Sequence, residues 1–139
     1  MKTYLFWIAL IIFAFVGGMF IVKPDTCGAE CDGIIKTVDA NEFNKQVKKG
    51  AATIIDVRTP EEYKEGHIEK AVNADFKNTG EFAKYLDSLD KSDKYMIYCR
   101  SGNRFGQALT LMQQKGFKNI TNLEGGILAW QSANFTLEK

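Results

Sequence analysis

A cysteine followed at once by arginines and glycines is the feature of this sequence best suited to chemistry. Cys99 ends an apolar run and precedes two arginines and two glycines, Arg100, Gly102, Arg104 and Gly106. The thiolate is the nucleophilic form of cysteine, and positive charge, inward-pointing backbone N–H groups and a helix N-terminus all stabilise it. A helical pattern begins directly after Arg104, and glycine permits the curved backbone that such a loop needs. The loop is therefore predicted to hold a reactive thiolate.

A buried structural cysteine with its arginines in solvent is the alternative interpretation, because cysteine is often buried. It does not explain why small and basic residues occupy the same short loop. Cysteine-dependent phosphatases use a C-x5-R loop that wraps a phosphate, whereas Cys99 to Arg104 is C-x4-R. The shorter loop favours a sulfur atom carried on the cysteine over a phosphoryl group.

Short apolar runs alternate with amphipathic stretches from residue 34 onward, and these elements must position the loop. The apolar runs predict strands at 34–38, 53–57, 71–75, 95–98 and 119–123. Apolar residues at helical spacing predict helices at 39–50, 59–66, 79–90, 105–116 and 125–133. Alternation of this regularity predicts an α/β fold with a five-stranded, mainly parallel sheet and helices on both faces.

Residues that cap helices mark three of the predicted helix starts. Asp39 is followed three residues later by Glu42, and Thr59 by Glu62, so both pairs are predicted capping boxes. Thr79 is predicted to cap the helix that begins there.

Charged residues end the second predicted strand at the same edge of the sheet as Cys99. Ligands bind beyond the carboxyl ends of parallel strands, so this edge is the predicted site. Asp56 and Arg58 come at the end of a buried strand, where charged groups must be paired or hydrated. We expect Asp56 to brace the cysteine loop and Arg58 to pair with Glu61 or Glu62.

Two other side chains invite a chemical role but are expected to be structural. His67, the only histidine, is expected to pack at a turn with its ring hydrogen-bonded to the backbone. Trp130 is expected to pack in the core beneath the last helix. With a single histidine in the chain, no metal site is predicted.

Three segments together resemble the signatures of a single rhodanese domain: DVRTPEEYKEGHI (56–68), YCRSGNR (98–104) and LEGGILAW (123–130). They occur in the order expected for that family, and the resemblance covers about residues 34–135. It implies a rhodanese-like fold in which Cys99 is the sulfur-carrying nucleophile. The substrate-binding loop of the family corresponds here to Arg100, Ser101, Gly102, Asn103 and Arg104.

The resemblance implies a sulfurtransferase that works in two steps without a cofactor. Cys99 would take the outer sulfur of a donor such as thiosulfate, release sulfite and become a persulfide, from which a thiol or cyanide accepts the sulfur. The expected partners are small sulfur-containing anions and thiol acceptors. The alternatives are a non-enzymatic sulfur or redox carrier for a membrane partner, and a cysteine-dependent phosphatase or arsenate reductase.

The N-terminal stretch differs in composition from the rest of the chain. Residues 5–22 are apolar and uncharged, close to the roughly 20 residues that a membrane-spanning helix requires. They predict a membrane anchor within residues 1–23, with a cleaved signal peptide as the alternative. Residues 24–33 are a predicted linker and 34–139 the rhodanese-like domain, which we expect to lie in the periplasm or another extracytoplasmic space.

The two remaining cysteines lie between the apolar N-terminal segment and the predicted domain. Cys27 and Cys31 form a C-x3-C pair, which in an oxidising compartment could close a small disulfide loop or take part in a sulfur relay.

The chain has 18 basic and 17 acidic residues and a net charge of +1. That balance argues against a nucleic-acid-binding protein, which usually carries a basic excess on one face.

Overall fold

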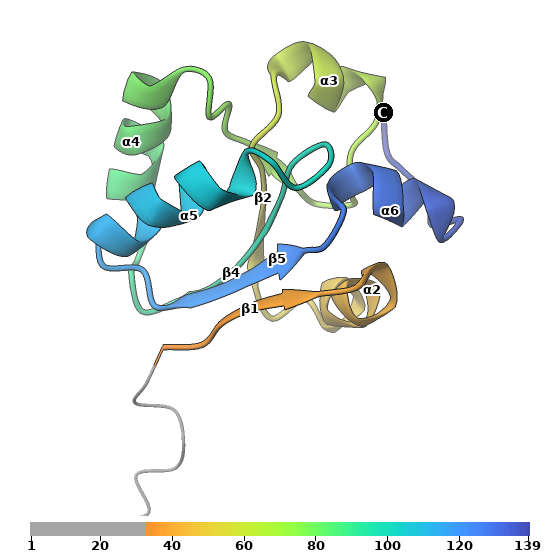
Figure 1. Ribbon diagram of the computed structural model, residues 1–139, viewed down its shortest axis with the longest axis horizontal. Coiled ribbons are helices and arrows are strands. Elements are labelled where there is room, and N and C mark those ends of the chain that lie inside the picture. The colour runs from red at the N-terminus through yellow and green to blue at the C-terminus, as the bar shows by residue number, and fades with distance from the viewer. Residues whose placement is uncertain (1–32) are drawn as a thin grey trace, which may run out of the picture. The chain divides into compact units, whose positions relative to one another are not determined.

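The computed structural model describes residues 33–139 of the chain (Figure 1). The predicted membrane segment, residues 5–22, and the pair Cys27 and Cys31 lie outside the described residues. Within the described part, no helix has the length and apolar character needed to cross a membrane.

Five parallel strands form the sheet, as the alternating sequence pattern predicts. They are β1 (Ile35–Val38), β2 (Thr53–Asp56), β3 (Val72–Asn73), β4 (Lys94–Tyr98) and β5 (Asn119–Leu123). Their order across the sheet is β1-β5-β4-β2-β3, and every neighbouring pair is parallel. The two strands that carry the predicted site residues, β2 and β4, are neighbours, with Asp56 opposite Tyr98. The carboxyl end of each therefore opens on one edge of the sheet.

Helices cover both faces of this sheet. They are α2 (Ala40–Lys49), α3 (Pro60–Glu65), α4 (Thr79–Asp87), α5 (Phe105–Gln114) and α6 (Gly126–Ser132). Figure 1 shows α4 and α5 together on one side of the strands and α2 and α6 on the other, with α3 beside the carboxyl edge. The predicted α/β fold, with a parallel five-stranded sheet and helices on both faces, is confirmed for this part of the chain.

The apolar residues of the strands divide between two cores because successive side chains point to opposite faces. Ile55 and Ile97 pack with α4 and α5, whereas Ile54 and Met96 pack with α2 and α6. Trp130 belongs to the second core and is 3% exposed, which confirms its predicted packing role.

Of the two predicted capping boxes, one is complete and the other forms only its N-cap half. The Asp39 carboxylate accepts a hydrogen bond from the Glu42 backbone N–H at 2.8 Å, although the Glu42 side chain accepts from Gln46 and does not close the box. The Thr59 and Glu62 box is complete in both directions.

The prediction for α4 is wrong in its capping residue. Asn78, and not Thr79, precedes the helix, and its side-chain oxygen accepts from the backbone N–H of Glu81 at 3.4 Å. The Asn78 backbone N–H donates to the Asp75 carbonyl oxygen at 3.2 Å, so a turn before the helix sets where it begins.

Candidate active site

The predicted cysteine loop connects β4 to α5 at the carboxyl edge of the sheet. Its central contact is a hydrogen bond of 2.9 Å from the Gly102 backbone N–H to the Cys99 sulfur. Gly102 has φ 105°, a conformation that side-chain-bearing residues rarely adopt, and this turns its amide toward the sulfur. One loop amide therefore points inward at the sulfur, where the sequence predicts several.

The sulfur is more enclosed than the surrounding arginines suggest. Cys99 is 1% exposed and belongs to the core cluster under α4 and α5, which includes Val57 and Ala108. Within residues 33–139, the Gly102 amide is the one hydrogen-bond donor that reaches it. Apolar side chains and the loop thus surround the thiol, and almost none of it is open to solvent.

Backbone hydrogen bonds connect the start of α6 to the cysteine loop. The backbone N–H groups of Ile127 and Leu128 donate to the carbonyl oxygens of Cys99 (2.9 Å) and Arg100 (3.2 Å). Gly126 makes this approach possible, because a Cβ there would lie 2.4 Å from the Cys99 carbonyl oxygen and 2.6 Å from that of Arg100. Its φ of 60° is also in the left-handed region. These contacts hold the first two residues of the loop, Cys99 and Arg100, against the start of α6.

Replacing Gly126 with alanine is expected to lower the free energy of unfolding by about 2–4 kcal/mol, because the methyl group meets backbone oxygens and φ is unfavourable. Gly106 is the matched control. It lies in α5 with open space around its Cα, so Gly106→Ala should raise stability by about 0.5–1 kcal/mol. Urea unfolding of both variants measures the contrast. Equal stability of the Gly126→Ala and Gly106→Ala variants would contradict the close contact between Gly126 and the carbonyl oxygens of the loop.

A bidentate ion pair connects the end of the cysteine loop to α3. Arg104 donates to the two carboxylate oxygens of Glu62 at 2.7 and 3.3 Å. The same carboxylate accepts from the Thr59 backbone N–H and lies 3.9 Å from Arg100. The hydrogen bonds from Arg104 lower the pKa of Glu62 from 4.5 to about 2. The guanidinium predicted to meet the substrate is therefore engaged by a carboxylate.

Glu62 is the site residue that the sequence analysis missed, since it was given only a capping role and a place among the partners of Arg58. Its contact with Arg104 joins residues 42 positions apart. The sequence signal for it is the cysteine loop itself: a second arginine next to a predicted buried site needs a carboxylate partner.

The lowered pKa of Glu62 predicts a specific acid sensitivity. A carboxylate whose pKa falls on folding stabilises the protein above its unfolded pKa and loses that contribution as pH falls through the folded pKa. We expect the native protein to exceed Glu62→Gln in stability by about 1–2 kcal/mol near neutral pH, with the difference vanishing between about pH 5 and about pH 2. Urea titrations across this range measure it. The exposed Glu65→Gln is the control on the same helix, and a constant difference for Glu62→Gln would contradict the ion pair.

Asp56 and Arg58 form a second ion pair, which corrects the expected partner of Arg58. Its Nη2 lies 2.6 Å from Asp56 Oδ2, its Nε is 3.0 Å from both carboxylate oxygens, and Nη2 also donates to the Gly66 carbonyl oxygen. Neither Glu61 nor Glu62 bonds to it. The guanidinium lies 5.7 Å from the ring centroid of Tyr98, the residue before the cysteine.

The bracing role of this pair is indirect. Asn73 donates to the carbonyl oxygens of Asp56 and Arg58, which connects the pair to β3, and the bond from Arg58 to the Gly66 carbonyl oxygen connects it to the end of α3. In the described residues no hydrogen bond runs from either side chain to residues 100–104. The pair fixes the strand end on which the loop rests, while Glu62 reaches the loop itself.

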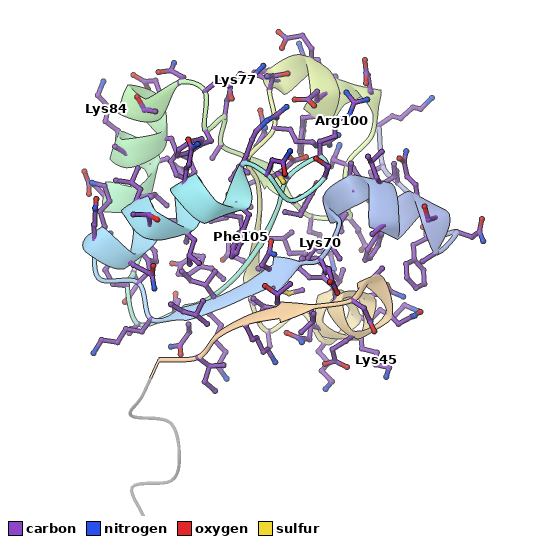
Figure 2. All side chains as sticks on the ribbon, in the orientation of Figure 1. Lys45, Lys70, Lys77, Lys84, Arg100 and Phe105 are labelled. Carbon is purple, nitrogen blue, oxygen red and sulfur yellow. The ribbon has the colours of Figure 1, made fainter. Side chains whose placement is uncertain are left out.

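The other predicted loop residues face solvent. Ser101 and Asn103 are exposed, and the Arg100 side chain is 64% exposed. Arg100 lies beside α3 in Figure 2. Its guanidinium makes no hydrogen bond within residues 33–139 and lies 3.9 Å from Glu62 Oε1, so its exposed side can still meet an anion.

His67 has the structural surroundings expected of it. Its Nδ1 lies 3.2 Å from the Tyr63 carbonyl oxygen, and its ring stacks on the Tyr63 ring with centroids 3.8 Å apart. Its backbone pairs with that of Glu138 in an antiparallel bridge, and it makes no hydrogen bond to the cysteine loop within the described residues.

Comparison with known protein families gives a consistent result. The sequence profile of the rhodanese-like domain matches residues 39–133. A rhodanese-related protein of Thermoplasma volcanium superposes with a TM-score of 0.64 at 29% identity, covering 74% of this chain and 97% of that one. A rhodanese-like domain protein of Staphylococcus aureus has a TM-score of 0.59 at 30% identity, covering 68% and 90%.

This chain covers very different shares of the named relatives that it matches. The tRNA uridine(34) hydroxylase of Pelagibacter ubique is 37% identical over 91 residues, which are 66% of this chain but 30% of that protein. Rhodanese-like domain-containing protein 17 of Arabidopsis thaliana is 31% identical over 134 residues, 86% of this chain and 85% of that protein. The chain thus spans about a third of the hydroxylases that it matches.

Proposed function

The chain belongs to the rhodanese-like domain family, and we propose that within it the protein is a sulfurtransferase that carries sulfane sulfur on Cys99. The observation that carries this proposal is the inward hydrogen bond of 2.9 Å from the Gly102 amide to the Cys99 sulfur. A backbone donor aimed at the sulfur can hold the negative charge of a persulfide carried on Cys99.

The proposed reaction consists of two displacements at sulfur. The Cys99 thiolate attacks the outer sulfur of thiosulfate, forms an S–S bond and expels sulfite with the electron pair of the broken bond. An acceptor thiolate then attacks the outer sulfur of the persulfide, and the Cys99 thiolate is the leaving group. Neither step needs a metal, an organic cofactor or a proton transfer at carbon.

Access to the sulfur requires loop motion, because Cys99 is 1% exposed. Gly102 is suited to act as the hinge, since its φ of 105° is open to glycine and a Cβ there would meet no atom. The exposed Arg100 would attract the anionic donor to the loop, while Arg104 keeps the end of the loop on α3 through Glu62.

Mass spectrometry of the full chain after incubation with thiosulfate tests the proposal. We expect Cys99 to gain the mass of one sulfur atom, and we expect reduction with dithiothreitol to remove it. Turnover of p-nitrophenyl phosphate without such a gain would instead identify a phosphatase. The pairing of Arg104 with Glu62 weighs against that alternative, because a phosphate-wrapping loop needs its arginine free.

The names of the hydroxylase relatives suggest a second candidate, a role in hydroxylation of uridine 34 of tRNA. Its support is 37% identity over 91 residues, a region that is 30% of that protein. Incubating the full chain with tRNA lacking the modification, followed by nucleoside analysis, tests it. The sulfur-transfer proposal predicts that no hydroxylated uridine forms.

We also propose that residues 5–22 anchor the chain in a membrane with the rhodanese-like domain on the extracytoplasmic side. The support is the uninterrupted apolar composition of that segment. Protease treatment of intact cells tests the arrangement. Digestion of the domain from outside agrees with it, whereas protection until the cells are lysed would contradict it.

A further inference from the structure

A cavity of about 240 Å³ lies directly beside the cysteine loop, between α3, α6 and the C-terminal segment. Its walls include Arg58, Arg100, Glu65, Leu128 and Leu137. In Figure 1 the loop between β4 and α5 projects toward the space between α3 and α6. The hydrogen bond from the Leu128 backbone N–H to the Arg100 carbonyl oxygen connects the α6 wall of the cavity to the loop.

Two guanidinium groups of different character line this cavity. Arg58 is 5% exposed, and its Nε and Nη2 are occupied by Asp56 and Gly66, but its Nη1 bonds to no residue in the range 33–139. Nη1 is therefore available to donate to a ligand oxygen in the cavity. Arg100 supplies a second cation whose side chain is 64% exposed. Together they can hold a carboxylate, for which guanidinium geometry is suited.

The other walls add an anion and an apolar surface. Glu65 makes no ion pair or hydrogen bond with another described side chain, in contrast to Glu62, whose carboxylate is held by Arg104. Leu128 is 44% exposed on the α6 side, and Leu137 completes the apolar wall. The cavity thus offers two cations, the Glu62 carboxylate that Arg104 already binds, the Glu65 carboxylate, and a small apolar surface within one amino-acid-sized volume.

We infer that this cavity binds an amino-acid or short-peptide thiol, with its carboxylate on Arg58 Nη1 and Arg100 and its ammonium group near Glu65. The inference rests on the proposed sulfur transfer and names the acceptor of its second step. The bound thiolate attacks the outer sulfur of the Cys99 persulfide, the new S–S bond forms on the acceptor, and the Cys99 thiolate departs with the electron pair of the old one.

Three acceptors separate the contributions of the charged groups. Cysteine carries both charges, cysteamine lacks the carboxylate, and 3-mercaptopropionate lacks the ammonium group. The full chain is loaded with thiosulfate, freed of donor, and mixed with each thiol while loss of the persulfide mass is followed. After correction for the thiolate fraction of each acceptor, the second-order rate constant for cysteine should exceed that for cysteamine by about tenfold or more.

Variants assign the preference to the cavity. Arg100→Ala should reduce the cysteine-to-cysteamine ratio, and Glu65→Gln should reduce the cysteine-to-3-mercaptopropionate ratio without changing the other. Glu69→Gln is the control, because Glu69 is exposed and does not line the cavity. Equal rates for cysteine and cysteamine, or an equal slowing of all three thiols in Arg100→Ala, would overturn the inference.

Binding without reaction keeps the test independent of sulfur transfer. S-methylcysteine cannot accept sulfur, and its titration into the full chain should shift the methyl NMR signals of Leu128 and Leu137. Failure of thiosulfate to load Cys99 would reject the proposed transfer, whereas the absence of these shifts would reject the cavity as a carboxylate site.

Discussion

Replacing Cys99 with serine is expected to abolish sulfur transfer, lowering kcat/KM with thiosulfate and cyanide by at least about 1,000-fold. A serine hydroxyl is not ionised near neutral pH and cannot form a stable bond to sulfane sulfur that it later releases. The substitution preserves shape, and the Gly102 amide that donates to the sulfur at 2.9 Å can donate equally to the hydroxyl oxygen. Thiocyanate formation measures the loss, and near-UV circular dichroism verifies that the fold is retained.

The double variant Cys27→Ser/Cys31→Ser is the matched control, since it removes the other two cysteines of the chain. Full turnover in that variant, combined with none in Cys99→Ser, assigns the transfer to Cys99 alone. Turnover that survives in Cys99→Ser would contradict the proposed function. Loss of turnover in the double variant would favour the carrier alternative, in which Cys99 passes sulfur to the C-x3-C pair.

The elements of this fold are predictable from sequence because each is encoded locally. Apolar runs of four to five residues mark the strands, and the complete capping box of Thr59 and Glu62 marks the start of α3. The error at α4 is also local in origin. Asn78 and Thr79 can both cap a helix, and the turn that begins at Asp75 decides between them.

The ion-pair partners of the charged residues at the site are not predicted from the sequence, for two different reasons. Asp56 and Arg58 are only two residues apart, but β2 ends at Asp56, and the predicted partner of Arg58 is a glutamate of the following helix and not Asp56. The contact between Glu62 and Arg104 spans 42 residues and depends on where α3 lies over the sheet. No local pattern contains that placement. The burial of Cys99 likewise depends on α5 and α6, which pack around the loop only in the complete fold.

The ion pair of Asp56 and Arg58 leads to the largest expected effect on stability. Asp56 is fully buried and Arg58 is 5% exposed, so water cannot solvate either charge well and each is stabilised mainly by the other. Replacing Asp56 with asparagine leaves the guanidinium buried without a countercharge, which is expected to lower the free energy of unfolding by about 3–5 kcal/mol. Because small domains have about 5–15 kcal/mol in total, urea unfolding should show a large shift of the midpoint.

Two further variants distinguish a lost countercharge from a general effect of the substitution. Asp87→Asn removes a carboxylate whose side chain is 62% exposed beside Lys115, and its effect should be much smaller because solvent screens that pair. The double variant Asp56→Leu/Arg58→Met removes both buried charges, so its loss should be smaller than the sum of the two single losses. A double variant as unstable as that sum would mean that each side chain acts through separate contacts, Arg58 through the Gly66 carbonyl oxygen and Asp56 through the turn after β2.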